Sequence, residues 1–155
     1  MKNGTRHFRR RIRRRGTKHV QLTKKSGYGL IAALELAANT GGNPIPAGVI
    51  AAKYGLPPAF VGKILHQLKG AGLISAKQGR SGGYVFALKP SDVSVRSVLE
   101  ALGESLDLVG CIDVASDCAL ASVCPIKAVW SGLDKKFKSL LESLSLYDMI
   151  ATDHD

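Results

Sequence analysis

Hydrophobic residues recur at three- and four-residue spacings along several stretches of the chain, the pattern of helices that bury one face. The first stretch begins after Leu22, has Thr23 as its N-cap and ends before the Gly-Gly-Asn-Pro segment at 41–44. The pattern therefore predicts an amphipathic helix here, whose apolar positions are Leu30, Ile31, Leu34, Ala37 and Ala38.

A second and a third helix are predicted to follow, separated by a tight turn. Residues 47–54 fit a short helix with Pro46 near its start, and Gly55 provides the left-handed residue that ends it. Residues 57–71 fit a third helix with a buried stripe of Val61, Ile64, Leu65 and Leu68. This order of helix, glycine turn and helix predicts a helix-turn-helix; the alternative is a plain helical hairpin.

Two short β-prone runs come next, at 73–76 and 84–87, on either side of a glycine-rich segment at 78–83. They predict a hairpin. Three helices followed by a glycine-rich hairpin describe a winged helix, with the hairpin as the wing. The predicted fold class is mainly α, within the α+β class.

The rest of the chain is predicted to hold a short helix at 95–102, an irregular segment with three cysteines, and a long helix at 126–144. No apolar helix remains in the sequence to cover the long one. We therefore expect it to pair with the same helix of a second subunit, in a homodimer. Its apolar face consists of Val129, Trp130, Leu133, Phe137, Leu140, Leu141 and Leu144.

Charge divides the chain into three parts. Residues 1–19 contain nine Lys or Arg and no acid, residues 20–91 contain eight basic residues and Glu35 alone, and residues 92–155 contain five basic and eleven acidic residues, for a net charge of +10. We assign 1–19 to a basic disordered extension, 20–91 to a winged-helix DNA-binding domain, and 92–155 to a cysteine loop and dimerisation helix. The basic first half indicates a polyanionic partner.

The basic extension at 1–19 has three interpretations. It is a phosphate-binding arm, a targeting peptide, or sequence that is not part of the working protein. The segment Val20-Gln21-Leu22-Thr23 favours the third, because a valine codon can serve as a bacterial start. We expect residues 1–19 to be dispensable for specific DNA binding.

Apolar run lengths and cysteine usage both point to one cellular compartment. No apolar run approaches the roughly 20 residues needed to cross a bilayer, so we expect no membrane partner. Three cysteines cannot all pair within one chain, which argues against a secreted disulfide scaffold. We expect a soluble, cytoplasmic protein.

Candidate DNA contacts lie on the third helix and on the wing. Lys63, His66 and Gln67 fall on the exposed side of the helix, where they could reach base edges or phosphates in the major groove. Arg80 lies at the hairpin tip and suits the negative potential of the minor groove. The alternative for Arg80 is an ordinary exposed turn arginine.

The three cysteines, Cys111, Cys118 and Cys124, follow the spacing C-x6-C-x5-C, with Pro125 after the last. Thiolates select zinc or iron–sulfur clusters, and four ligands complete either kind of site. One ligand must then come from elsewhere. By spacing alone, buried structural cysteines remain the alternative.

Four features together resemble the iron–sulfur cluster regulator family of IscR and NsrR type. They are Gln-Leu-Thr-Lys-Lys-Ser-Gly-Tyr at 21–28, Gly-Arg-Ser-Gly-Gly-Tyr at 79–84, the cysteines followed by Trp130, and Leu-Ser-Leu-Tyr-Asp-Met-Ile at 144–150. The resemblance covers residues 20–150. It implies a homodimeric winged-helix transcription regulator, and we expect repression or dual regulation. We also expect binding to double-stranded DNA at an imperfect palindrome, because a two-fold protein presents two recognition helices related by the same axis.

The resemblance also implies site residues. The three cysteines would hold a 2Fe-2S or 4Fe-4S cluster whose state sets operator affinity in response to nitric oxide, iron or cluster status, or redox state. The implied DNA contacts are Thr23, Lys24, Lys25, Tyr28, Ala59, Phe60, Lys63, His66, Gln67, Arg80, Ser81 and Gly82.

The chain departs from the family pattern at three places. Lys127 stands where the IscR branch has a histidine ligand, and Gly27 stands where the NsrR branch has an acidic ligand. The wing has Gln78 and Arg80 around its first glycine, where the family has arginine and proline. The fourth cluster ligand is therefore unassigned, and the candidates are Asp113, Asp117, His19, Glu35 or a small exogenous ligand.

Two rival functions remain open from the sequence. The first keeps DNA binding but replaces the cluster with zinc or a cysteine thiol switch. The second is an electron-transfer or cluster-carrier protein, which leaves the helix-turn-helix and the wing unexplained. An enzyme is not expected, because no nucleophile and base pair and no phosphate-cradling loop are recognisable.

Overall fold

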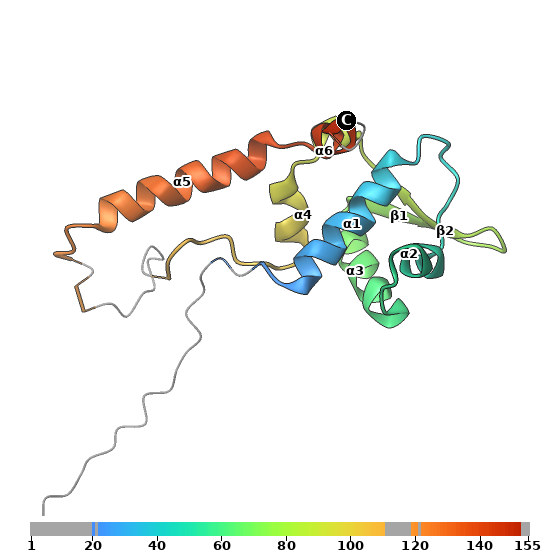
Figure 1. Ribbon diagram of the computed structural model, residues 1–155, viewed down its shortest axis with the longest axis horizontal. Helices are drawn as coiled ribbons and strands as arrows, with labels where there is room; N and C mark the ends of the chain where they lie inside the picture. Colours follow the sequence, from blue (N-terminus) through green and yellow to red (C-terminus); the bar gives the residue numbers. More distant parts are fainter. Residues whose placement is uncertain (1–19, 21, 111–118, 121, 153–155) are drawn as a thin grey trace, which may run out of the picture.

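The computed structural model describes residues 20, 22–110, 119–120 and 122–152 (Figure 1). The basic extension, Cys111 and Cys118 lie outside the described residues. The elements in chain order are α1 (Lys24–Ala38), α2 (Ala47–Tyr54), α3 (Pro58–Gly70), β1 (Ile74–Lys77), β2 (Gly83–Phe86), a 3-10 turn η1 (Pro90–Asp92), α4 (Val95–Ala101), α5 (Lys127–Ser143) and α6 (Leu146–Thr152).

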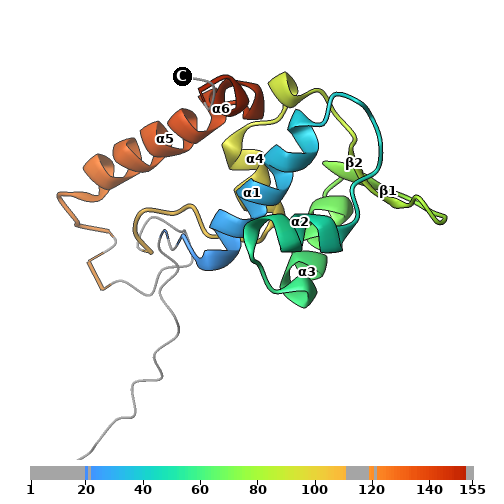
Figure 2. The ribbon, with the colours of Figure 1, turned by 45° about the vertical axis from the view of Figure 1, so that its right-hand side comes forward.

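The three predicted helices of the DNA-binding domain are confirmed within one or two residues. Thr23 is the N-cap of α1, and its N–H donates to the Ser26 hydroxyl at 2.9 Å. This bond is part of a capping box at the N-terminus of the helix. Gly55 ends α2 with φ +62°, a conformation that favours glycine. Helices α2 and α3 lie side by side below α1 (Figure 2).

The wing is a two-stranded antiparallel hairpin that projects away from the helices (Figure 2). Its register pairs Ile74 with Phe86 and Lys77 with Gly83, so each strand lies one residue from its predicted position. The shift in β1 arises because the Leu73 amide still bonds to the last turn of α3, at the carbonyl of Leu68. A Cβ on Gly83 would lie 2.5 Å from the Ile45 carbonyl carbon, so only glycine fits against the segment that precedes α2.

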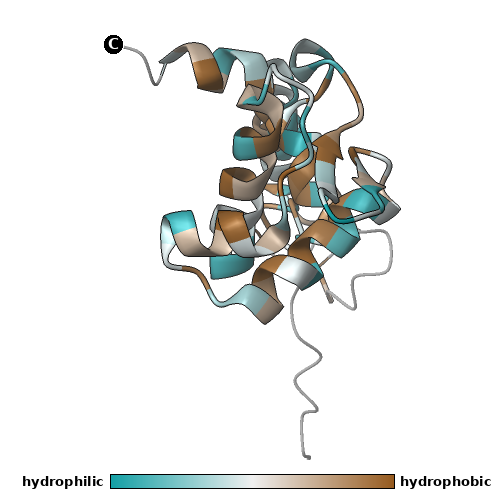
Figure 3. Cartoon of the chain, turned by 90° about the vertical axis from the view of Figure 1, so that its right-hand side faces the viewer, coloured by the Kyte–Doolittle hydropathy of each residue, from teal (hydrophilic) through white to brown (hydrophobic). Residues whose placement is uncertain are grey.

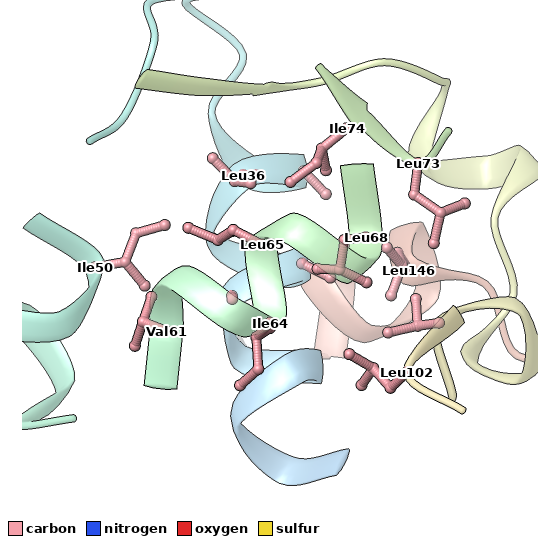
Figure 4. Close-up of a cluster of buried hydrophobic side chains, with 14 of the residues drawn as sticks. Leu36, Ile50, Val61, Ile64, Leu65, Leu68, Leu73, Ile74, Leu102 and Leu146 are labelled. Atoms are coloured by element: carbon pink, nitrogen blue, oxygen red, sulfur yellow. The ribbon is translucent and has the colours of Figure 1, made fainter. Parts of the chain in front are cut away.

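The core lies between α1, α2, α3 and the base of the wing (Figure 4). The predicted stripe of α3 is fully buried there, with each of its four residues at most 1% exposed. Val93, Val98 and Leu102, at and around α4, and Leu146 of α6 belong to the same cluster. Residues on both sides of the predicted boundary at 91 and 92 therefore share one core.

Helix α6 is an element that the hydrophobic pattern did not predict. Helix α5 begins far from the winged helix and runs back toward it, and α6 then packs against α1 (Figure 1). Leu146 is fully buried, and its N–H donates to the Val93 carbonyl at 2.9 Å. The C-terminal end of the described chain thus completes the DNA-binding domain.

Helix α5 is long and amphipathic, as predicted, but most of its apolar residues are exposed. Val129 is 59% exposed and Leu140 is 57% exposed. Near its C-terminal end, Leu141 packs against a small second cluster formed by Val95, Leu99 and Leu106. Among the described helices, none is long and apolar enough to span a membrane.

Candidate DNA-binding face and cysteine segment

The exposed side of α3 forms an open groove of about 580 Å³. Six of the residues predicted to contact DNA line it together, so the fold brings them to one surface. They are Lys25, Ala59, Phe60, Lys63, His66 and Gln67, with Gly62 and Ile64 completing the lining.

The two ends of this groove differ in polarity. Ala59 and Phe60 lie in the first turn of α3, and the Phe60 ring packs edge-on against the Tyr28 ring with centroids 5.8 Å apart. Lys63, His66 and Gln67 follow along the helix, and all three are exposed. The helices seen in Figure 3 carry both hydrophobic and hydrophilic residues along their length, as expected for helices that bury one face and expose the other.

Thr23 and Lys25, at the start of α1, have intramolecular partners. The Thr23 hydroxyl donates to Glu104 at 2.6 Å, and the Lys25 ammonium donates to the Leu102 carbonyl at 2.5 Å. Glu104 lies 3.9 Å from the same ammonium. These two residues fasten α1 to the segment after α4, whereas Lys24 is exposed.

The wing presents Arg80 and Ser81 as exposed residues at its tip. Gly79 has φ +113°, and a Cβ on Gly82 would lie 2.5 Å from the Lys77 carbonyl oxygen. The tight turn at the tip therefore requires these glycines. It places Arg80 at the far end of the hairpin. The structure places the predicted wing contacts on one turn.

Glu35, the sole acid of residues 20–91, is neutralised locally. Its carboxylate accepts hydrogen bonds from Lys53 at 2.7 and 2.8 Å and from the Tyr54 hydroxyl at 2.6 Å. Partial burial opposes ionisation, but the bonds from Lys53 and Tyr54 outweigh it and lower the pKa of Glu35. The carboxylate is thereby engaged between α1 and α2, which argues against Glu35 as a cluster ligand of its own subunit.

Of the three cysteines predicted to hold a cluster, the structure describes Cys124 only. It is a half-buried free thiol three residues before α5, and its carbonyl accepts from the Lys127 N–H at 3.4 Å. Within the described ranges no three His, Cys, Asp or Glu side chains converge on a metal position. The donor chemistry of one accessible thiol is compatible with a cluster, and the other two thiols lie outside the described residues.

A bridging segment, residues 102–108, connects α4 to the cysteines and contacts two other elements. On one side it binds the start of α1 through Leu102 and Glu104, as described above. On the other it binds α5, because the Leu108 N–H donates to Asp134 at 2.9 Å and Lys138 bonds to Asp107 at 2.6 Å. The segment therefore joins the DNA-binding domain to the long helix.

Asp134 is the buried acid that anchors this segment to α5. It is 5% exposed and pairs with Lys138 at 2.8 Å. Burial opposes its ionisation, but the bonds from Lys138 and the Leu108 amide prevail and lower its pKa. Sequence reasoning missed these residues, although an acid and a lysine four positions apart on a helix, Asp134 and Lys138, are a recognisable pair.

The winged-helix fold and the groove along α3, with its exposed Lys63, His66 and Gln67, define a class: the winged-helix DNA-binding regulators. The chain belongs to the Rrf2 family, described as an iron-dependent transcriptional regulator, whose pattern matches residues 22–152. The family is one of transcriptional regulators, which confirms the prediction of a non-enzymatic protein.

Relatives and solved structures agree with this assignment. The HTH-type transcriptional regulator IscR of Aliivibrio salmonicida is 28% identical over 84% of this chain and 77% of its own, and that of Escherichia coli K12 is 27% identical over 84% and 80%. T. potens IscR superimposes with a TM-score of 0.67 at 27% identity, covering 90% of this chain and 92% of its own. CymR, the global cysteine regulator of B. subtilis, gives 0.70 at 25% identity, covering 85% and 97%.

Proposed function

We propose that the protein is a cytoplasmic, homodimeric repressor that binds an imperfect palindrome and whose operator affinity is set by an iron–sulfur cluster. The observation that carries the proposal is the placement of the predicted DNA contacts. Six predicted contacts share the groove along α3, and Arg80 and Ser81 are exposed at the wing tip. A recognition helix fits the major groove, and a wing arginine fits the adjacent minor groove.

Helix α5 supports the dimer. Three large apolar residues of α5 and the leucine that follows it are at least 41% exposed: Val129, Leu133, Leu140 and Leu144. A helix face of this kind is stabilised by burial against another apolar surface, and a second copy supplies an identical one. Two-fold symmetry then presents two recognition helices to a two-fold symmetric operator.

Thiolate chemistry and the relatives support the cluster. Cys111, Cys118 and Cys124 would hold it, and cysteine thiolates are the ordinary ligands of 2Fe-2S and 4Fe-4S clusters. Relatives that share most of the chain's length are IscR regulators within a family described as iron-dependent. A cluster with one ligand other than cysteine would have a labile position at which nitric oxide or oxygen reacts.

The bridging segment gives the cysteines a mechanical route to the DNA-binding domain. It continues directly into the cysteine segment, and it is hydrogen-bonded both to the start of α1 and to α5. A change in the cysteine segment would therefore act on the position of α1 relative to α5. Both helices bear on the geometry of a dimer that must fit two half-sites at a fixed spacing.

Anaerobic purification with absorption spectra and iron and sulfide counts tests the cluster, and DNA binding before and after exposure to nitric oxide or oxygen tests its control of affinity. The proposal expects a visible spectrum that is lost in Cys111→Ala, Cys118→Ala and Cys124→Ala and retained in Lys127→Ala. A visible spectrum that persists in all three cysteine variants would contradict the cluster.

A second candidate replaces the cluster with zinc or a thiol switch. The likeness to CymR favours it, because this global cysteine regulator of B. subtilis shares the fold at 25% identity. Reconstituted protein that contains zinc and no sulfide, or that changes DNA affinity on reversible thiol oxidation without iron, would support this candidate instead.

A further inference from the structure

The recognition helix begins with a turn that has no polar side chain. Its N-cap is Pro57, its first residue is Pro58, and Ala59 and Phe60 follow. Pro57, Pro58 and Ala59 are exposed, and Phe60 is half-buried. The part of α3 that would enter a major groove first is therefore apolar.

The backbone of this turn also offers few hydrogen-bond donors. Proline has no N–H, so two of the amides that a helix start ordinarily presents to phosphate are missing at Pro57 and Pro58. The amides of Phe60 and Val61 donate to the Pro57 carbonyl at 3.0 and 3.1 Å. This helix start is poorly suited to bind a phosphate or to donate to a base edge.

Gly62, one turn further along, lines the same groove as Ala59 and adds no side chain to it. A Cβ at this position would have no neighbour within 4 Å, so the glycine is not required by packing inside the chain. Polar side chains begin only at Lys63, followed by His66 and Gln67. The groove is thus apolar at its leading end and donor-rich behind it, and it is lined by no carboxylate.

In the major groove of DNA, the 5-methyl group of thymine is the base feature that an apolar surface recognises, and alanine and phenylalanine side chains are suited to it. We propose that Ala59, which lines the groove together with Phe60 and Gly62, reads thymine methyl groups in each operator half-site. Ala59 is the specificity-determining residue of this contact. The inference rests on the proposed function, because it requires that α3 enters the major groove.

The donor-rich part of the groove is also suited to bases in the DNA major groove. Lys63 can donate to the O6 and N7 acceptors of guanine, and Gln67 can make a paired contact with adenine. No carboxylate lines the groove to accept from the cytosine amino group. The strand facing the first turn should therefore contain thymine where Ala59 lies.

The test starts with the intact protein and a randomised DNA pool. Selection gives the preferred half-site, and each thymine in it is then replaced by deoxyuridine, which removes only the 5-methyl group. We expect one or two positions at which this replacement weakens binding about fourfold, the value of about 0.8 kcal/mol for one buried methyl-sized group. No effect of deoxyuridine at any thymine would overturn the inference.

The variant Ala59→Gly assigns the effect to this turn, because it removes the methyl group that would face the thymine. In Ala59→Gly the deoxyuridine penalty should disappear at the assigned position, whereas the matched variant Gln67→Ala should retain it. Thermal unfolding of both variants checks that α3 remains folded. A penalty that persists unchanged in Ala59→Gly would place the thymine contact elsewhere and overturn the inference.

Two further outcomes separate the inference from the proposed function. If no sequence is enriched and the protein binds DNA without preference, both fail together. If a palindrome is enriched but amide exchange in the complex leaves the first turns of α3 unprotected, then DNA binding stands and the role of Ala59 is wrong. If only guanine or cytosine is enriched opposite the first turn, DNA binding likewise stands and the role of Ala59 is wrong.

Discussion

The DNA-binding domain buries its apolar residues, whereas the long helix α5 leaves most of its apolar residues exposed. In α3 the apolar stripe is at most 1% exposed, whereas in α5 the single buried residue among those described is the acid Asp134. Val129 and Leu140 of α5 are more than half exposed. The first region buries its apolar residues within one chain, and the second leaves them exposed on a surface that the proposed dimer would cover.

The difference teaches where each kind of mutation should act. A substitution in the core of the winged helix should lower the stability of each subunit. A substitution on the exposed face of α5 should leave the folded subunit intact and act on assembly. In the proposed homodimer, operator binding would depend on both, because two correctly placed recognition helices would contact a symmetric site.

The largest effect is expected for Leu140→Glu, which places a charge on the proposed dimer face of α5. Dissociation removes the gain from two linked half-site contacts, so affinity for a full palindrome should fall about 10²- to 10⁴-fold. Sedimentation and gel-shift titration measure the two quantities. The matched substitution Lys136→Glu, at an exposed polar position of the same helix, should leave the dimer intact.

The next effect concerns Leu146→Ala, which empties a fully buried position in the domain core. Removing a buried leucine side chain in this way costs about 2–5 kcal/mol of unfolding free energy. Chemical denaturation should show this loss. The neighbouring exposed substitution Tyr147→Ala should change stability by much less, and equal losses would contradict the role of α6 in the core.

A smaller effect is expected for Arg80→Ala at the wing tip. If the guanidinium enters the minor groove, operator binding should weaken by about 1–3 kcal/mol with no change in folding. Affinity should also fall steeply between about 50 and 200 mM salt, because basic residues displace counterions from phosphates. Arg96→Ala is a suitable control, because Arg96 pairs with Glu100 at 2.8 Å on α4 rather than facing the groove. Equal binding by the two variants would remove the wing from the interface.

The smallest effect is a pH dependence that originates at Asp134. Its pKa in the folded protein lies below the ordinary value of 3.8, so the folded state binds this proton more weakly than the unfolded state. The carboxylate therefore stabilises the fold at pH values above about 4, and this contribution of about 1 kcal/mol or less is lost as the pH falls through the folded-state pKa.

The variant Asp134→Asn should remove this contribution, so that unfolding free energy depends less on pH in the acidic range. Unfolding free energies measured between about pH 2 and pH 6 should differ between the wild type and the variant at the upper end and converge at the lower end. A constant difference across this range would show that the carboxylate charge has no role in anchoring the bridging segment.

The sequence predicted the parts of this fold that depend on local patterns. Proline and glycine at 46 and 55 bracket α2 because their backbone preferences act over one or two residues. Helix α6 was missed, although Ser145 and Asp148 form a reciprocal cap that is visible as a Ser-x-x-Asp pattern. The pattern is short, and the burial of Leu146 depends on the distant Val93.

The candidate site shows the same limit. The exposed side of α3 followed from helical periodicity, so the grouping of Lys63, His66 and Gln67 was predictable. The partners of Thr23 and Lys25 were not, because Glu104 and Leu102 are separated from them by 81 and 77 residues along the chain. Only the folded backbone brings these groups together, and sequence spacing holds no signal of such a contact.

The most direct test of cluster control compares the operator affinity of one preparation with and without the proposed cluster. Wild-type protein purified without oxygen, and the same protein after cluster removal, should differ about 5- to 150-fold in affinity, which corresponds to about 1–3 kcal/mol of coupling. Cys124→Ala should bind like the cluster-free protein under both conditions. Equal affinity of the two wild-type forms would contradict control by a cluster.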